Sequence, residues 1–113
     1  MKIRLSFIGN SSSSSFLIKN RTTLTLTAKD FAEEVSYLVE EFNKSYGCTY
    51  TEKEFIEASK NYPTYIWKPE EEKLVSFGDH DQNPMGNILD YALRDFDNGT
   101  TTSFEWRFDH HER

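Results

Sequence analysis

Hydrophobic and polar side chains alternate along three stretches of the chain, residues 2–8, 22–27 and 102–108, and residues 16–19 resume the apolar pattern after the serine tract. Successive side chains of a strand point to opposite faces of a sheet, so this period of two predicts half-buried strands. The early stretches favour an antiparallel hairpin over residues 1–27. In that hairpin the serine-rich residues 9–15 form the connecting loop.

Apolar residues at spacings of three and four predict three helices between the first and last strands. The first begins after Thr27 as N-cap and ends at Gly47, a residue suited to the left-handed C-terminal position. The second begins after Thr51. For the third, Asn83 and Pro84 are suited to the N-cap and the first helical position.

Residues 64–68 and 73–77 predict a second strand pair around a polar turn. The order is therefore β-β-α-α-β-β-α-β, which indicates an α+β fold with one mixed sheet backed by helices. We expect a single domain over residues 1–113. It comprises the N-terminal hairpin 1–27 and an α/β body 28–113.

Charge divides these two parts. The chain has a net charge of −6, yet residues 1–29 contain five basic residues and no acid. The body is acidic. This polarity predicts a protein partner, and the overall negative charge disfavours nonspecific binding of nucleic acid.

The sequence contains no apolar run of the roughly 18 residues that a membrane-spanning helix needs, so no membrane association is expected. Cys48 is the single cysteine and has no partner within the chain for a disulfide. Both features are typical of a cytoplasmic protein.

Two polar clusters are candidate metal ligands. If strands 73–77 and 102–108 are adjacent and parallel, the segments that follow them meet at one edge of the sheet. Carboxylate and imidazole ligands together suit Zn²⁺, Mn²⁺ or Fe²⁺. We expect no other cofactor. The alternative to a metal site is that the loop after residue 77 only caps the following helix and that the C-terminal histidines are frayed. The candidate ligands are Asp79, His80, Asp81, His110 and His111.

The basic hairpin is a candidate surface for phosphate or a partner protein, because basic side chains, hydroxyls and backbone N–H groups all bind phosphate oxygens. Ordinary charge on an edge strand is the alternative. The serine tract itself suits a plain loop, a phosphorylation site or a loop that binds a partner. The candidate residues are Arg4, Asn10, Ser11, Ser12, Ser13, Ser14, Ser15, Lys19 and Arg21.

The string from Lys2 to Ile18, with Asn10, five serines and Phe16, resembles an N-terminal tract of small uncharacterised proteins, many encoded by tailed bacteriophages and some by bacteria. The usual tract has Phe-Val-Ser-Asn before the serines, whereas this chain has Ile8 and Gly9 at the Val-Ser positions. The resemblance covers residues 1–18 and implies a phage-like origin. It carries over no catalytic residue.

We therefore expect a phage-encoded accessory protein that acts in the cytoplasm of the host cell by non-enzymatic binding to a host or phage macromolecule. One alternative is a small metal-dependent enzyme, similar to a phosphoesterase, that uses the Asp/His cluster. Another is a minor structural component of the virion. No nucleophile elbow or phosphate-binding loop motif is present in the sequence, which favours binding over catalysis.

Overall fold

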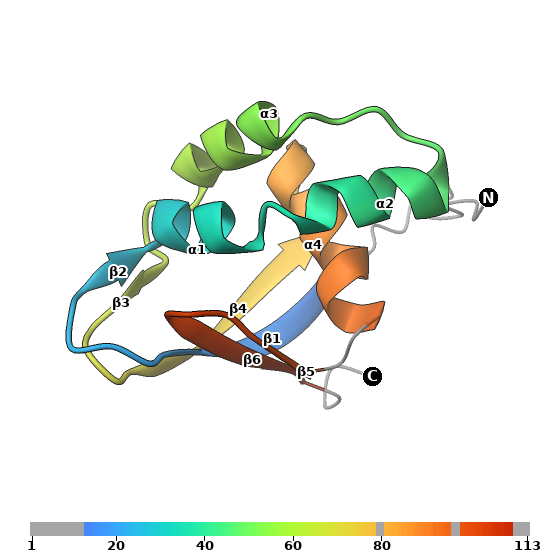
Figure 1. Ribbon diagram of the computed structural model, residues 1–113. Helices are drawn as coiled ribbons and strands as arrows, with labels where there is room; N and C mark the ends of the chain where they lie inside the picture. Colours follow the sequence, from blue (N-terminus) through green and yellow to red (C-terminus); the bar gives the residue numbers. More distant parts are fainter. Residues whose placement is uncertain (1–12, 79–80, 96–97, 110–113) are drawn as a thin grey trace.

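Helices cover one face of a four-stranded sheet, and none of the described helices lies on the other face (Figure 1). The computed structural model describes residues 13–78, 81–95 and 98–109. The helices in these ranges are α1 (Ala28–Val35), α2 (Leu38–Tyr46), α3 (Glu52–Glu57), the 3-10 helix η2 (Ala58–Asn61) and α4 (Pro84–Asp95). The strands are β1 (Ser13–Asn20), β2 (Leu26–Thr27), β3 (Ile66–Trp67), β4 (Glu72–Gly78), β5 (Asn98–Thr100) and β6 (Phe104–Phe108).

The main sheet has the order β4-β1-β6-β5, and every neighbouring pair is antiparallel. The α+β class is confirmed, but the mixed sheet was a wrong prediction. Strands β4 and β6 do run parallel to each other, as expected for a crossover through α4. They are not neighbours, because β1 lies between them and pairs with both.

Part of the serine tract is strand and not loop, which corrects the predicted loop over residues 9–15. Ser13, Ser14 and Ser15 extend β1 and pair with residues 76–78 of β4. Ser14 is buried beneath α4, where its hydroxyl donates a hydrogen bond to Asp90 Oδ1 at 2.6 Å. A small side chain lets the helix approach closely at this point, and the carboxylate satisfies the buried hydroxyl.

The predicted pairing of residues 22–27 within an N-terminal hairpin is also wrong. Only Leu26–Thr27 of that stretch is strand, and it pairs with β3 in a separate two-stranded sheet. The buried side chain of Asn20 ends β1 by accepting the Thr22 N–H at 2.8 Å and donating to the Leu24 carbonyl at 2.6 Å. These bonds hold a turn where the sequence pattern alone suggests a continuing strand.

The predicted first helix is interrupted. At Ser36 the hydroxyl donates to the Glu33 carbonyl at 3.1 Å, so a side chain competes with the helical backbone bonds and α1 ends. Helix α2 then continues to Gly47, whose φ of 67° is the predicted left-handed stop. The predicted caps at Thr27 and Thr51 are confirmed as reciprocal capping boxes.

Aromatic side chains fill the space between the helices and the sheet. Phe31 of α1 packs edge-on against Phe104 and Trp106 of β6, with ring centroids 5.0 and 5.9 Å apart, and it is stacked with Phe77 of β4. Helix α1 is thereby fixed over the middle of the sheet. No helix within the described ranges combines the length and apolar character needed to cross a membrane.

Candidate functional site

Of the five predicted metal ligands, the described ranges include only Asp81, which is already engaged. Its Oδ2 atom accepts the Tyr62 hydroxyl at 2.6 Å and the Gly78 N–H at 3.1 Å. Since β1 separates β4 from β6, the segments that follow those strands leave the sheet two strands apart, about 10 Å. The four other predicted ligands lie outside the described residues: Asp79, His80, His110 and His111. The metal site therefore stays a prediction, and the described ranges hold no group of three suitable ligands.

Through these two hydrogen bonds Asp81 joins Tyr62, the residue after η2, to the end of β4. Burial of Tyr62 and its hydrogen bond to Asp81 raise the pKa of the tyrosine hydroxyl well above its usual value near 10. Asn83 caps α4 as predicted, because its Oδ1 accepts the Gly86 N–H at 2.8 Å. A Cβ at Gly86 would stand 2.7 Å from Asp81 Oδ2 and from the Tyr62 hydroxyl. Glycine is what permits this close approach.

The predicted partner or phosphate surface is divided by the structure. Arg4, Asn10, Ser11 and Ser12 lie outside the described residues, so their roles stay predictions. Ser13 is exposed at the start of β1, whereas Ser14 and Ser15 are buried and cannot serve as an open hydroxyl surface. Lys19 and Arg21 are the two described basic members.

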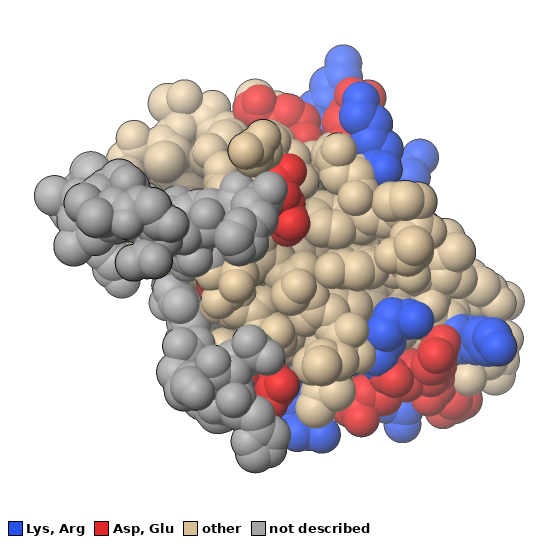
Figure 2. All heavy atoms as spheres, turned by 180° about the vertical axis from the view of Figure 1, so that it is seen from behind, with Lys and Arg blue, Asp and Glu red and all other residues tan. Residues whose placement is uncertain are grey.

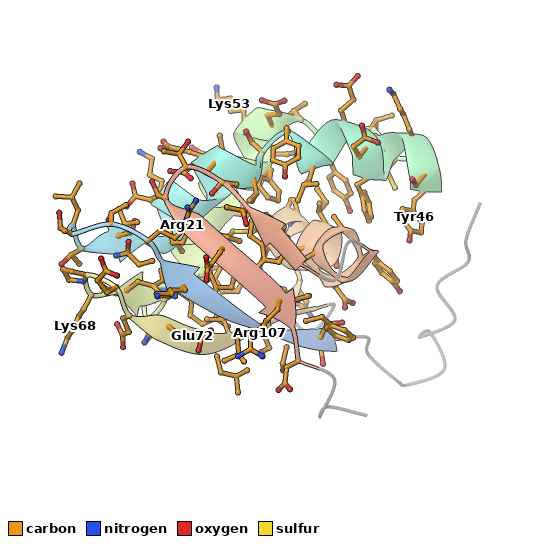
Figure 3. All side chains as sticks on the ribbon, turned by 60° about the horizontal axis from the view of Figure 1, so that its bottom comes forward. Arg21, Tyr46, Lys53, Lys68, Glu72 and Arg107 are labelled. Carbon is orange, nitrogen blue, oxygen red and sulfur yellow. The ribbon has the colours of Figure 1, made fainter. Side chains whose placement is uncertain are left out.

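We define the outer sheet face as the side of the main sheet on which no described helix lies, and Figure 3 shows Arg21 on it. Lys19 belongs to the same face, because it alternates along β1 with the buried Ile18 and Asn20. Arg21 donates to the Thr101 carbonyl at 2.8 Å, and its Nε lies 3.8 Å from Glu105. Lys19 stands in register between Glu72 of β4 and Glu105 of β6. The basic side chains predicted to bind a partner are thus opposed by glutamates of their own sheet.

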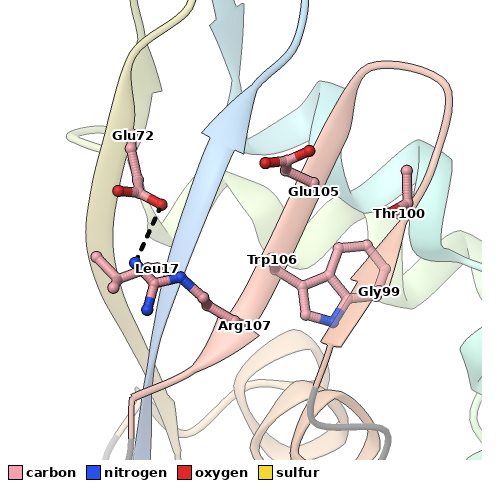
Figure 4. A pocket seen from close by; sticks show the side chains of 7 residues that line it. All are labelled: Leu17, Glu72, Gly99, Thr100, Glu105, Trp106 and Arg107. Atoms are coloured by element: carbon pink, nitrogen blue, oxygen red, sulfur yellow. Dashed lines mark ion pairs between the residues drawn. The ribbon is translucent and has the colours of Figure 1, made fainter.

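A further ion pair crosses the outer sheet face. Arg107 of β6 reaches over β1 to Glu72 of β4, with 3.7 Å between Arg107 Nη2 and Glu72 Oε2 (Figure 4). Beside this pair is a hollow of about 300 Å³, which Leu17 and Thr100 also line. Both signs of charge are present here and are matched across the strands.

A different surface carries basic residues without such partners. Two adjoining hollows, of about 570 and 310 Å³, follow the line where α3 and η2 meet the start of α1. The larger is lined by Lys29, Lys53, Ile56, Glu57, Ser59 and Lys60. The smaller shares Lys29, Ser59 and Lys60 and adds Thr27, Ala28, Tyr62, Pro63, Tyr65 and Ile66. We call the two together the lysine groove.

The three lysines of the groove are exposed, and none forms an ion pair with a residue in the described ranges. Glu57 is the one acid among the lining residues. The apolar part includes Ile56 and Ile66, and 45% of the Ile66 surface remains exposed. Figure 2 shows basic and acidic side chains together at this end of the helical layer, next to a broad surface that carries no charge.

Hydrogen bonds hold the walls of the lysine groove in place. Tyr62 is fixed by Asp81, and the Tyr65 hydroxyl donates to the Ser76 carbonyl at 2.7 Å and accepts the Ser76 N–H at 3.2 Å. On the α1 side, Glu34 accepts from Thr101 and Ser103 and ties the helix to the sheet. Burial opposes ionisation of Glu34, but the hydrogen bonds outweigh it and lower its pKa.

The lysine groove was not predicted from the sequence, although the sequence contains one signal for it. Lys53, Ile56 and Lys60 follow at spacings of three and four, which place them on one side of a helix. The glutamates between them dominate the charge count of the segment. Lys29 belongs to the basic opening segment, so neither region alone indicates a cluster.

Comparisons of the chain with protein-family models, with curated proteins and with solved structures gave no match.

Proposed function

We propose that the protein is a binding protein whose lysine groove holds a segment of another protein. The observation that carries this proposal is the continuity of the groove. Its two hollows share Lys29, Ser59 and Lys60, and apolar and basic side chains line them together. Protein-binding surfaces combine apolar contacts with polar groups that set orientation in this way.

The anchored walls support binding over a passive surface depression. Tyr62 and Tyr65 stack on each other with ring centroids 5.0 Å apart, and each hydroxyl is held by a separate partner. A surface that is already ordered loses less conformational entropy when a partner binds. The proposal keeps the predicted non-enzymatic binding role and moves it from the basic N-terminal segment to the lysine groove.

Two matched substitutions test the location of the binding surface. Ile66 in the groove and Leu74 on the outer sheet face are both exposed aliphatic residues, at 45% and 55% of their surfaces. We expect tagged wild-type protein to retain a specific partner from a lysate of cells that express it. Ile66→Glu should lose that partner, and Leu74→Glu should retain it.

The reverse result, with loss in Leu74→Glu alone, would place binding on the outer sheet face. Retention of the partner by both variants would exclude the groove. Thermal unfolding of the two variants controls for the fold, since both positions are exposed and tolerate a charge.

A further inference from the structure

We infer that the segment held in the lysine groove is acidic and carries apolar side chains between its carboxylates. This inference rests on the proposed function and specifies the chemistry of the partner. It starts from the contrast between the groove lysines and the other cations of the surface. Arg21, Lys44 and Arg107 each lie within 4 Å of a glutamate oxygen.

Lys29, Lys53 and Lys60 have no such partner among the described residues, and they converge on one groove from three elements. Lys19, Lys68 and Lys73 are also without an ion pair in these ranges, but none of them lines the groove. A carboxylate entering the groove would thus meet several cations whose charge is not already matched.

The start of α1 also favours a negatively charged partner. Thr27, Ala28 and Lys29 line the groove at the N-terminal end of the helix, where the helix dipole favours negative charge. The Asp30 carboxylate of the capping box offsets part of this effect. The lysines therefore remain the main source of attraction.

The net charge of −6 opposes the approach of an acidic partner at long range. Salt screens exposed charges over a Debye length of about 8 Å at physiological ionic strength, so distant acids of the protein contribute little. At contact the three groove lysines outweigh the single Glu57 of the lining. The charge of the lining therefore favours a carboxylate at contact.

Part of the lining of the groove is apolar and favours apolar side chains in the partner. Ile56, Pro63 and Ile66 form this part, and the aliphatic stems of the lysines can extend the apolar contact. Single-stranded nucleic acid would supply the negative charge, but its bases bind by stacking on aromatic rings. Tyr62 and Tyr65 are stacked on each other, which occupies one face of each ring. The lining therefore favours an acidic peptide.

Selection from a displayed library of random peptides against the full chain tests this inference. We expect the selected peptides to carry net negative charge together with aliphatic or aromatic residues. Their affinity, measured by fluorescence anisotropy, should fall by about tenfold or more in the variant Lys29→Glu/Lys53→Glu/Lys60→Glu. Lys44→Glu at the end of α2 has the same type of charge change away from the groove, and it should alter affinity by less than about twofold.

The possible outcomes separate the inference from the proposed function. Neutral or basic peptides whose binding is lost in Ile66→Glu would overturn the acidic partner and leave the groove as the binding surface. A selection without any groove-dependent peptide would overturn both. A labelled single-stranded oligonucleotide that binds more tightly than the selected peptides, with the same dependence on the three lysines, would also overturn the peptide inference. Circular dichroism of each variant confirms that the fold is retained.

Discussion

The lysine groove and the outer sheet face contain similar numbers of basic residues but differ in how those residues are matched. On the sheet, Arg21 and Arg107 lie within 4 Å of Glu105 and Glu72, respectively. In the groove, Lys29, Lys53 and Lys60 have no ion pair with a described residue. A surface whose charges are satisfied internally has less to gain from a partner.

The comparison also shows why the charge of a segment is a poor guide to the charge of a surface. The opening segment is basic in sequence, yet the sheet brings Glu72 and Glu105 beside its cations. The helical segment that carries Lys53 and Lys60 is acidic overall, yet its lysines share one groove. In the folded protein the basic segment is therefore matched by glutamates, whereas the acidic segment contributes lysines to a groove.

The largest expected effect is on the anchored wall of the lysine groove. Gly86→Ala places a Cβ 2.7 Å from Asp81 Oδ2 and 2.8 Å from the Gly78 carbonyl, so α4 must shift away from the wall. We expect the free energy of unfolding to fall by about 2–3 kcal/mol. Urea denaturation measures it, and a loss below about 0.5 kcal/mol would show that this contact is not tight.

A smaller loss is expected for Tyr62→Phe, which removes the hydroxyl that donates to the Asp81 carboxylate. Hydrogen bonds to charged groups contribute about 1.5–3 kcal/mol, so we expect a loss near the lower end of that range. Tyr65→Phe is the matched control, because its hydroxyl binds the backbone of Ser76. It should cost about 0.5–1.5 kcal/mol. Equal losses in the two variants would contradict a special role for Asp81.

The same hydroxyl predicts a dependence of stability on alkaline pH. The pKa of Tyr62 is raised in the folded protein, and an unfolded tyrosine ionises near pH 10. Above that pH the unfolded chain releases a proton that the folded chain retains, so stability falls as pH rises. Urea denaturation between pH 8 and about 11 should show a shallower decline in Tyr62→Phe than in wild type. Parallel curves for the two proteins would contradict the raised pKa.

The smallest expected effect is on the outer sheet face. A double-mutant cycle with Glu72→Gln and Arg107→Gln should give a coupling energy below about 1 kcal/mol, because exposed ion pairs are screened by solvent. Neither substitution should change partner binding by more than about twofold. Loss of binding in Arg107→Gln would indicate that the outer sheet face takes part in binding the partner.

Local signals were sufficient to predict the caps and stops of the helices. Thr27, Thr51 and Asn83 act as N-caps and Gly47 ends α2, because each of these interactions spans only three or four residues. The alternation of residues 102–108 likewise predicted β6, whose Phe104 and Trp106 are buried.

The sequence pattern could not predict which strands pair when they are far apart in the chain. Nothing local to Ser13–Ser15 indicates that β4 extends far enough to pair with them, or that α4 supplies Asp90 to the buried Ser14 hydroxyl. The insertion of β1 between β4 and β6 joins segments more than 50 residues apart in the chain. The lysine groove depends on the same kind of contact, since Lys29 meets Lys60 only after α1 packs against η2.

Site-specific photo-cross-linking is the most direct test of the lysine groove as the binding surface. A photo-reactive phenylalanine analogue would replace Ile66 in one variant and Leu74 in another, since both positions are exposed. After irradiation in a lysate of cells that express the protein, we expect position 66 to give a discrete cross-linked product. Position 74 should not give that product. Mass spectrometry should identify an acidic segment at the site of attachment. A discrete product from position 74 alone, or identical products from both positions, would contradict the groove as the binding surface.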